Sequence, residues 1–421
     1  MKIIENLDKK QFEEFVLNSN KAHFMQSYAW GDVMKHKNFT PEYIGFEENN
    51  KLVGVSLLLK KRLNKNYCYY YCPRGFITDF NNLELVENIS KELKNYGKKN
   101  KAIYIKIDPD IKRHNLSIDG QIDDSYNNYK LIDKLKTLGY KHTGYNVLFT
   151  NEQPRFTFRL NLDDTFENIY NNFHATTKKI LNKGNEYKLN VYKGNINDIE
   201  CFYETMKETA KRENLSCLPI NYYKNFYEIL NNENMSDIFI CKVNINDLKN
   251  LYKDKINDLK EKQNSINTTT KKGINKKNEL ENELNKAIND LKQIEEISME
   301  EITLSAIITV KYKDKVWTIH GGNSTLLRNL NSNYLLYYTI IKDAYDNGYK
   351  TIDFFGTSGI ANPPKNNPIY GIHSFKKRLG GEYTEFIGEF DLICNKTLYF
   401  IFKKIIKIRR KLIKAKQKRN N

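Results

Sequence analysis

The runs DFFGTSG, at residues 353–359, and FKKRLGGEYTEFIGEFD, at residues 375–391, decide the fold of this chain of 421 residues. Lys350–Phe355, with apolar residues at Ile352, Phe354 and Phe355, predicts a strand, which runs into a turn at Gly356–Gly359. The residues from Phe375 onward predict a short basic helix. By themselves the two runs therefore indicate a strand, a glycine-containing turn and a helix, an order that is typical of α/β and α+β domains.

The rest of the chain shows the same mixture of elements. Strands are predicted at Tyr43–Glu47, Leu52–Leu59, Ala102–Ile107, Phe158–Leu162, Glu301–Lys311 and Lys315–Gly321, and helices at Leu85–Tyr96 and Tyr334–Asn347. The first two strands flank a turn at Asn49-Asn50, and Asp163 or Asp164 is expected to cap the helix after the fourth strand. A chain of this length, with 40% hydrophobic residues, can build the cores of two or three domains.

The segment Ile245–Ser298 differs from everything around it, because it has no proline, one glycine and a high content of Lys, Glu, Asp, Asn and Leu. Apolar residues recur at spacings of three and four on both sides of a polar break at Thr268–Gly273. This pattern predicts two amphipathic helices folded back on each other, as a protruding hairpin rather than a pair packed on the body. A group of lysines near the break, which suits an RNA backbone or plain solvation, consists of Lys271, Lys272, Lys276 and Lys277.

The net charge of +17 is unevenly distributed. From Lys396 to the end there are eleven Lys or Arg residues and no Asp or Glu, which leaves +6 for the first 395 residues. In Leu398–Lys418 these charges alternate with apolar residues, among them Leu412 and Ile413. The pattern predicts a basic amphipathic helix that lies on an anionic membrane surface, and contact with tRNA is the alternative.

Several classes of protein are disfavoured. The six cysteines and seven histidines have no zinc-site spacing, so no metal is expected. The N-terminus lacks the apolar core of a signal peptide, and no stretch has the roughly 18 apolar residues of a membrane span, so we expect a cytoplasmic protein. Phosphate-binding, nucleophile-elbow and dinucleotide-binding glycine motifs are also absent from the sequence.

Short unusual segments remain as candidates for chemistry. They are FMQSYAW (24–30), CPRG (72–75), IKIDP (105–109), TAKR (209–212), and the two runs at 353–359 and 375–391. With the inserted helical pair, these segments resemble the Fem family of peptidoglycan-bridge aminoacyltransferases nearly from end to end. The chain departs from that pattern at Trp317–Gly322, which lacks a tyrosine pair, and at Asn172–Lys183, which lacks an Arg-Asn pair.

The resemblance implies two GNAT-like (acetyltransferase-like) domains of mixed α/β structure. The first would span residues 1–150 and be completed by 386–400, and the second would span 151–385 with an antiparallel coiled-coil arm at 246–298. Residues 396–421 would form the basic tail.

The resemblance also implies an enzyme that needs no cofactor. It would move an amino acid from aminoacyl-tRNA to the stem-peptide amino group of a peptidoglycan precursor, either lipid II or a UDP-linked muropeptide. The basic tail favours the lipid-linked acceptor and peripheral contact with the inner face of the membrane. Alternatives are an acyl-CoA-dependent N-acyltransferase and a non-enzymatic membrane- or RNA-binding protein. The transferred amino acid, its position in the bridge and the oligomeric state stay open.

The resemblance assigns roles to single residues. Lys376 matches a family lysine suited to stabilising the oxyanion of ester aminolysis, since a charged lysine is a far-reaching donor. Asp108, before Pro109, is expected to bind or deprotonate the attacking ammonium, or to cap a turn. The remaining candidates are Lys35 and Arg212 for a diphosphate, Lys37 as the competitor of Lys35, and Gly356, Ser358 and Gly359 for close backbone approach to the substrate.

Overall fold

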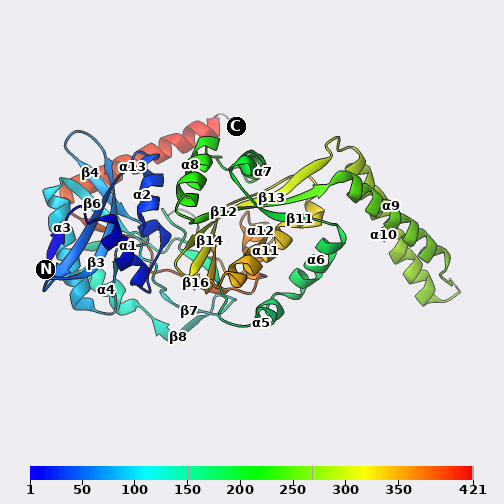
Figure 1. Ribbon diagram of the computed structural model, residues 1–421, viewed down its shortest axis with the longest axis horizontal. Helices are drawn as coiled ribbons and strands as arrows, with labels where there is room; N and C mark the ends of the chain where they lie inside the picture. Colours follow the sequence, from blue (N-terminus) through cyan, green and yellow to red (C-terminus); the bar gives the residue numbers. More distant parts are fainter. Residues whose placement is uncertain (149–151, 268, 420–421) are drawn as a thin grey trace.

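A computed structural model of the chain describes residues 1–148, 152–267 and 269–419. Two large sheets lie side by side, a pair of long helices projects away from the second, and the C-terminal helix runs over the first (Figure 1). The predicted mixed α/β fold class is confirmed. Of the predicted break in the helical insertion, Thr268 lies outside the described residues.

The first sheet has the strand order β1-β2-β3-β4-β6-β17-β9, with β5 paired to β3. Its strands are β1 (Lys2–Ile4), β2 (Thr40–Glu48), β3 (Lys51–Arg62), β4 (Cys68–Cys72), β5 (Ile77–Thr78), β6 (Ala102–Ile107), β9 (Tyr140–His142) and β17 (Phe390–Ile393). Helices α1 (Lys9–Asn18), α2 (Tyr28–Lys35), α3 (Leu83–Lys99) and α4 (Tyr129–Thr137) pack on it. The predicted turn is confirmed, because β2 and β3 pair around Asn49 and Asn50, which both have positive φ.

The second sheet has the order β11-β12-β13-β14-β15-β10-β16. Its strands are β10 (Phe156–Asn161), β11 (Asn190–Gly194), β12 (Ser236–Asn244), β13 (Glu301–Tyr312), β14 (Lys315–Asn323), β15 (Thr351–Gly356) and β16 (Glu382–Glu385). Its helices are α5 (Phe166–Asn171), α6 (Ala175–Glu186), α7 (Ile199–Arg212), α8 (Ile220–Asn231), α11 (Ser332–Asp346) and α12 (Tyr370–Lys377). A separate two-stranded sheet is formed by β7 (His114–Leu116) and β8 (Ile122–Asn127).

Each large sheet contains one parallel strand pair joined by a helix. In the first sheet α3 connects β4 to β6, and the two strands pair as far as Cys72 and Ile107, their last residues. In the second sheet α11 connects β14 to β15, and this ladder ends at Trp317 and Asp353. Since β14 runs on to Asn323, the second pair separates where the first stays closed.

The two sheets share a hydrophobic core, so they form one folded body. Buried residues of that core come from the first sheet and its helices and from the second sheet, and include Phe24, Trp30, Val55, Leu57, Phe226, Ile308, Val310 and Trp317. The side chain of Trp317 is 1% exposed and packs edge-on against Phe24 at a ring distance of 5.1 Å. Relative movement of the sheets would open this packed interface.

The helical insertion consists of α9 (Ile245–Asn264) and α10 (Lys271–Glu295), which run back along each other between β12 and β13. Their facing stripes bury Leu248, Tyr252 and Ile256 from α9 and Ala287 and Ile294 from α10. The pair projects from the end of the second sheet into solvent (Figure 1). Thr270 caps α10 by accepting from the backbone N–H of Gly273, so the helix begins inside the predicted break.

The predicted cap of the helix after β10 is wrong. Thr165, not Asp163 or Asp164, is the N-cap of α5, because its hydroxyl accepts from the backbone N–H of Asn168 at 3.3 Å. Asp163 instead closes a turn by donating its backbone N–H to the side chain of Asn161. That turn delays the start of the helix.

The C-terminal helix α13 (Lys396–Arg419) has one face on the first sheet and one face in solvent. Its Tyr399 hydroxyl donates to the buried carboxylate of Asp391 at 2.8 Å, and Lys403 pairs with the same carboxylate at 2.7 Å. The side chains from residue 410 onward, including Leu412 and Ile413, lie outside the described residues. Within the described part of the chain, no helix is both long and apolar enough to cross a membrane.

Candidate active site

Asp108 stands directly after the last residue of β6 and is 3% exposed. Its carboxylate accepts from the backbone N–H of Arg74 at 2.6 Å and from the hydroxyl of Tyr71 at 2.8 Å. It therefore caps the turn after β4, which is one of the two roles left open by the sequence. Burial raises the pKa of Asp108 to about 7, although the nearby charge of Arg74 opposes this. A carboxylate tuned to this range can also exchange a proton near neutral pH.

The turn that Asp108 holds is fixed from the other side by Gln26. The Gln26 amide donates to the carbonyl of Pro73 at 2.6 Å and accepts from the backbone N–H of Leu57 at 2.9 Å. Ser27, its neighbour, is the N-cap of α2. The early motif is thus structural, because it secures the turn against which Asp108 lies.

Lys376 is on α12 and is 5% exposed. Its Nζ donates to the carbonyl oxygens of Gly356 at 2.7 Å and Phe355 at 3.2 Å, both at the end of β15. Burial lowers the pKa of Lys376 to about 7, while the carboxylate of Asp353 opposes that shift. A charged ammonium has three N–H donors, so one donor is left for a developing negative charge.

Phe355 has an unusual backbone. Opposite β10, the strand β15 contains one extra residue between Asp353 and Gly356, which makes a bulge. Phe355 has φ of 58°, a left-handed conformation that is rare for a bulky side chain. Asp353 supports this conformation by accepting from the backbone N–H of Phe355 at 2.8 Å. Strain of this kind is typical of functional sites.

The two halves of the site face one small cavity between the sheets. Arg74, which contacts Asp108 through its backbone, lines this cavity together with Phe355 and Gly356, which hold Lys376. The residues that bind Asp108 on the first sheet and Lys376 on the second sheet therefore meet at a common space.

Of the two neighbouring lysines, Lys37 turns toward the second sheet. Its ammonium lies 4.3 Å from the ring centre of Tyr222, and burial lowers its pKa, an effect that Glu152 opposes. Lys35 is 59% exposed and pairs with Asp32 at 2.6 Å. The charge of the Glu152 carboxylate raises the pKa of both Lys37 and Tyr71, although burial has the larger influence on each group.

Arg212 lies at the C-terminal end of β14. It ends α7 and donates to the carbonyl of Asn323 at 3.2 Å. His320, three residues earlier on β14, packs against Tyr222 and is kept neutral, since burial and then the charge of Lys37 lower its pKa to about 3. At about 3.3 Å per strand residue, His320 near Lys37 and Asn323 beside Arg212 are roughly 10 Å apart along β14.

The predicted glycine turn has separate roles for its members. The Gly356 carbonyl binds Lys376, whereas the carbonyl of Ser358 accepts from the hydroxyl of Tyr383 at 2.6 Å. A Cβ at Gly359 would lie 2.4 Å from the ring of Phe156, so packing requires this glycine. Only Gly356 of the three is in contact with Lys376 among the hydrogen bonds of the described residues.

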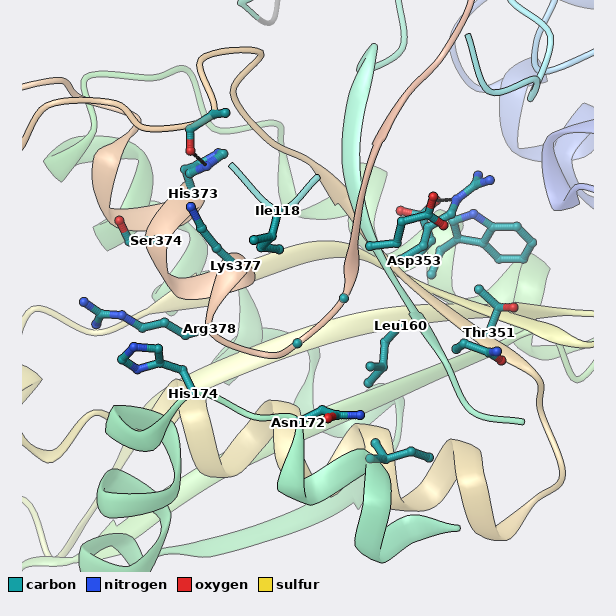
Figure 2. Close-up of a pocket in the computed structure, with 18 of the residues that line it drawn as sticks. Ile118, Leu160, Asn172, His174, Thr351, Asp353, His373, Ser374, Lys377 and Arg378 are labelled. Carbon is teal, nitrogen blue, oxygen red and sulfur yellow. Dashed lines mark hydrogen bonds and ion pairs between the residues drawn. The ribbon is translucent and has the colours of Figure 1, made fainter. Parts of the chain in front are cut away.

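A larger cavity of about 1300 Å³ adjoins the site. Figure 2 shows His174, Lys377 and Arg378 on one side of it and Asp353 on the opposite side. Asp353, Arg159 and Trp317 line both this cavity and the small one, so they form the wall between them. Among residues 1–148, 152–267 and 269–419, no cluster of His, Cys, Asp and Glu could hold a metal ion.

Comparison with known proteins identifies the family. The model of the FemAB family matches residues 7–407. The chain belongs to the FemAB family. The resemblance noted in the sequence is thereby confirmed.

Relatives of this FemAB protein match over their full length. It is 28% identical to the lipid II:glycine glycyltransferase of Staphylococcus epidermidis, over 98% of this chain and 97% of that one. It is 27% identical to the protein of the same name from Staphylococcus aureus, with the same coverage. The crystal structure of FemX matches 95% of this chain and 99% of its own with a TM-score of 0.74 and 26% identity.

Sequence reasoning missed several residues of the FemAB site. Tyr71 directly precedes the CPRG turn and Arg74 lies within it, so the motif itself was a usable signal for both. Glu152, His320 and Arg159 had no such signal, because each reaches the site through the packing of the two sheets.

Proposed function

We propose that this FemAB protein transfers an amino acid from aminoacyl-tRNA to the stem-peptide amino group of lipid II, with no further cofactor. The observation that carries the proposal is that Arg74, which donates its backbone N–H to Asp108, lines one small cavity between the sheets together with Phe355 and Gly356, whose carbonyls accept from Lys376. The names of the full-length relatives support a lipid-linked acceptor.

The two residues suit the two charges of ester aminolysis. As the amine nitrogen bonds to the ester carbonyl carbon, it must lose a proton, and the Asp108 carboxylate can accept it. The carbonyl oxygen becomes an oxyanion, to which the free N–H of the Lys376 ammonium can donate. When the carbon–oxygen bond to the tRNA ribose breaks, the ribose oxygen leaves and takes up the proton held by Asp108. The products are an amide and a free tRNA end.

Basic groups around the site suit the anionic parts of both substrates. We assign Lys37 and Arg212 to the diphosphate of the acceptor, since Lys37 lies near His320 and Arg212 bonds to Asn323, both on β14. Lys35 suits this role less well, because its side chain is 59% exposed, whereas that of Arg212 is 20% exposed although Arg212 also pairs with Glu213. Lys377 and Arg378, beside the larger cavity, suit the phosphates at the tRNA end. The lysines near the tip of the helical pair suit the tRNA body.

The tail helix suits attachment to the inner membrane surface. On its solvent face Phe400, Ile401, Ile405 and Ile408 are each at least 50% exposed. Lys404, Lys407 and Arg409 are exposed among them. At about 1 kcal/mol per basic residue near an anionic surface, these charges and the apolar stripe support reversible binding.

The function is tested with purified protein, lipid II, a panel of charged tRNAs and, separately, acetyl-CoA. We expect transfer of an amino acid that ribonuclease abolishes. Transfer from acetyl-CoA and not from any charged tRNA would refute the proposal in favour of an acyl-CoA-dependent enzyme.

Membrane attachment is tested by sedimentation with vesicles that contain phosphatidylglycerol. The double variant Ile401→Ser, Ile405→Ser should lose most of the binding, because it shortens the exposed stripe without touching Tyr399 or Lys403. Ile122→Ser, at an apolar residue that is 58% exposed on β8, is the matched control. Equal binding by both variants would exclude α13 as the contact.

A further inference from the structure

The two halves of the site are joined by a chain of part-buried contacts through Arg159 on β10, whose side chain is 23% exposed. Its Nη2 donates to Asp110 Oδ2 at 2.6 Å, and its Nε donates to Asp353 Oδ2 at 2.8 Å. Asp110 lies two residues after Asp108, and Asp353 lies two residues before Phe355. One guanidinium therefore spans the segment that carries Asp108 and the bulge that holds Lys376.

On the second sheet, a continuous series of hydrogen bonds connects Arg159 to Lys376. The other oxygen of Asp353 accepts from the Thr157 hydroxyl and from the backbone N–H of Phe355. The carbonyl of that same Phe355 accepts from Lys376. Arg159 thus fixes Asp353, Asp353 fixes the left-handed backbone, and the backbone fixes the ammonium.

On the first sheet, Arg159 supplies the charge that Asp110 requires. Burial would raise the pKa of Asp110, but Arg159 outweighs burial and lowers it. The other neighbour, His23, lies 3.9 Å away, and burial lowers its pKa well below its usual value, so it is neutral at pH 7. Burial likewise opposes the charge of Arg159, and Asp110 and Asp353 together more than offset it. The three groups are ionised as a unit.

Aromatic packing also ties Arg159 to the turn that Asp108 caps. The guanidinium carbon of Arg159 lies 4.7 Å from the ring centre of Phe386, and that of Arg74 lies 4.4 Å from the same ring. Lysine could not replace this geometry, because its single ammonium cannot bond to two carboxylates in a plane while stacking on a ring.

We propose that Arg159 is a positioning residue of this enzyme, which sets the distance and orientation between Asp108 and Lys376 from outside the reacting groups. The inference rests on the proposed function for its kinetic consequence, but not for its structural one. Arg159 acts through Asp110 and Asp353, and a small displacement of either catalytic candidate costs rate because reacting groups need near-exact alignment.

The kinetic test compares Arg159→Met with Arg155→Met. Arg155 is buried, four residues earlier, but pairs with Glu385 and not with Asp110 or Asp353. We expect Arg159→Met to lower kcat about 100-fold, with KM for lipid II changed less than about threefold. Arg159→Lys, which keeps the charge, should retain the fold and lie between Arg159→Met and the unchanged protein. Arg155→Met should lower thermal stability without a comparable loss of kcat.

A second readout needs no substrate. The titration of Lys376 is followed by the pH dependence of its reaction with an amine reagent, quantified by mass spectrometry. Asp353 already favours the charged form of Lys376, and His373 and Lys377 are the other titratable groups near it. Loss of the Arg159 charge leaves Asp353 uncompensated, so the pKa of Lys376 should rise in Arg159→Met and stay unchanged in Arg155→Met.

The inference is overturned if Arg159→Met keeps kcat, or if Lys376 titrates alike in both arginine variants. These outcomes are separate from a failure of the proposed function. If the unchanged protein transfers no amino acid, the function is refuted, while the titration still decides whether Arg159 holds Lys376.

Discussion

The two sheets contain the same strand–helix–strand unit, one closed and one open. β4 and β6 pair along their whole shared length, and Asp108 at the end of β6 is bonded directly to the turn after β4. β14 and β15 part after Trp317 and Asp353, and a bulge with a left-handed Phe355 follows. The closed unit holds a carboxylate in a rigid frame, whereas the open unit exposes backbone carbonyls that a lysine from another helix can use. The same connection thus positions two different residues that we propose to be catalytic.

The difference follows from what each strand end must bind. In the closed unit, the ladder of β4 and β6 reaches Ile107, so Asp108 is the first residue beyond it and its carboxylate accepts from Arg74 and Tyr71. In the open unit, the carbonyls of Phe355 and Gly356 are released from that parallel ladder and need other donors. The Lys376 ammonium donates to both of these carbonyls. Because Lys376 is buried, its protonation depends on the charged groups around the bulge.

The largest loss of activity is expected from a substitution of Lys376, in the open unit. Lys376→Met should lower kcat about 1000-fold, since it removes the oxyanion donor while filling similar space. Binding of charged tRNA, measured by filter retention, should change less than about twofold. If turnover survives in a variant whose circular dichroism is unchanged, Lys376 does not stabilise the oxyanion.

A substitution of Asp108, in the closed unit, should cause a smaller loss of activity. Asp108→Asn should lower kcat about 100-fold, because the amide can still cap the turn but accepts no proton. Tyr71→Phe, which removes one hydrogen bond and no charge, should cost less than about threefold and serves as the control. Similar losses in both variants would mean that Asp108 acts only as the turn cap.

The pH profile of kcat tests both sides together. Asp108 must be ionised, which occurs above its pKa of about 7, and Lys376 must be charged, which occurs below its pKa of about 7. Activity should therefore peak near pH 7 and fall about tenfold per unit further out on each side. In Asp108→Asn the acidic limb should disappear and the alkaline limb stay. A flat profile from pH 6 to 8 would contradict these assignments.

The smallest effect concerns the neighbouring lysines. Lys37→Ala should raise KM for lipid II about tenfold through loss of a phosphate contact, whereas Lys35→Ala should leave KM within about twofold. The exposed pair of Lys35 with Asp32 makes it the matched control. The reverse order of effects would place the diphosphate on the solvent side of α2.

Most helices and strands could be predicted from the sequence, because they depend on local periodicity. Ala102–Ile107 was predicted with the bounds of β6, and the strand before the glycine turn was predicted as Lys350–Phe355, one residue too early at each end. The choice between Lys35 and Lys37 had no such local signal. Helix α2 ends at Lys35, so helical periodicity does not extend to Lys37.

Contacts between distant segments were not predictable in the same way. The bond from Tyr71 to Asp108 depends on the parallel register of β4 and β6, and the contact of Arg159 with Asp110 depends on how two sheets pack. A glycine at position 355 would have been a sequence signal for the left-handed backbone, but a phenylalanine is not. Asp353 and the bulge impose this conformation. Such features arise from tertiary structure and not from a pattern of neighbours.

The position of β17 has a consequence for biosynthesis. This strand, at Phe390–Ile393, is inserted between β6 and β9, and β9 has no other partner strand among the described residues. During translation, the first sheet therefore keeps an open edge at β6 until Ile393 has been added to the chain. The segment that carries Asp108 is thus made long before the strand that completes its sheet.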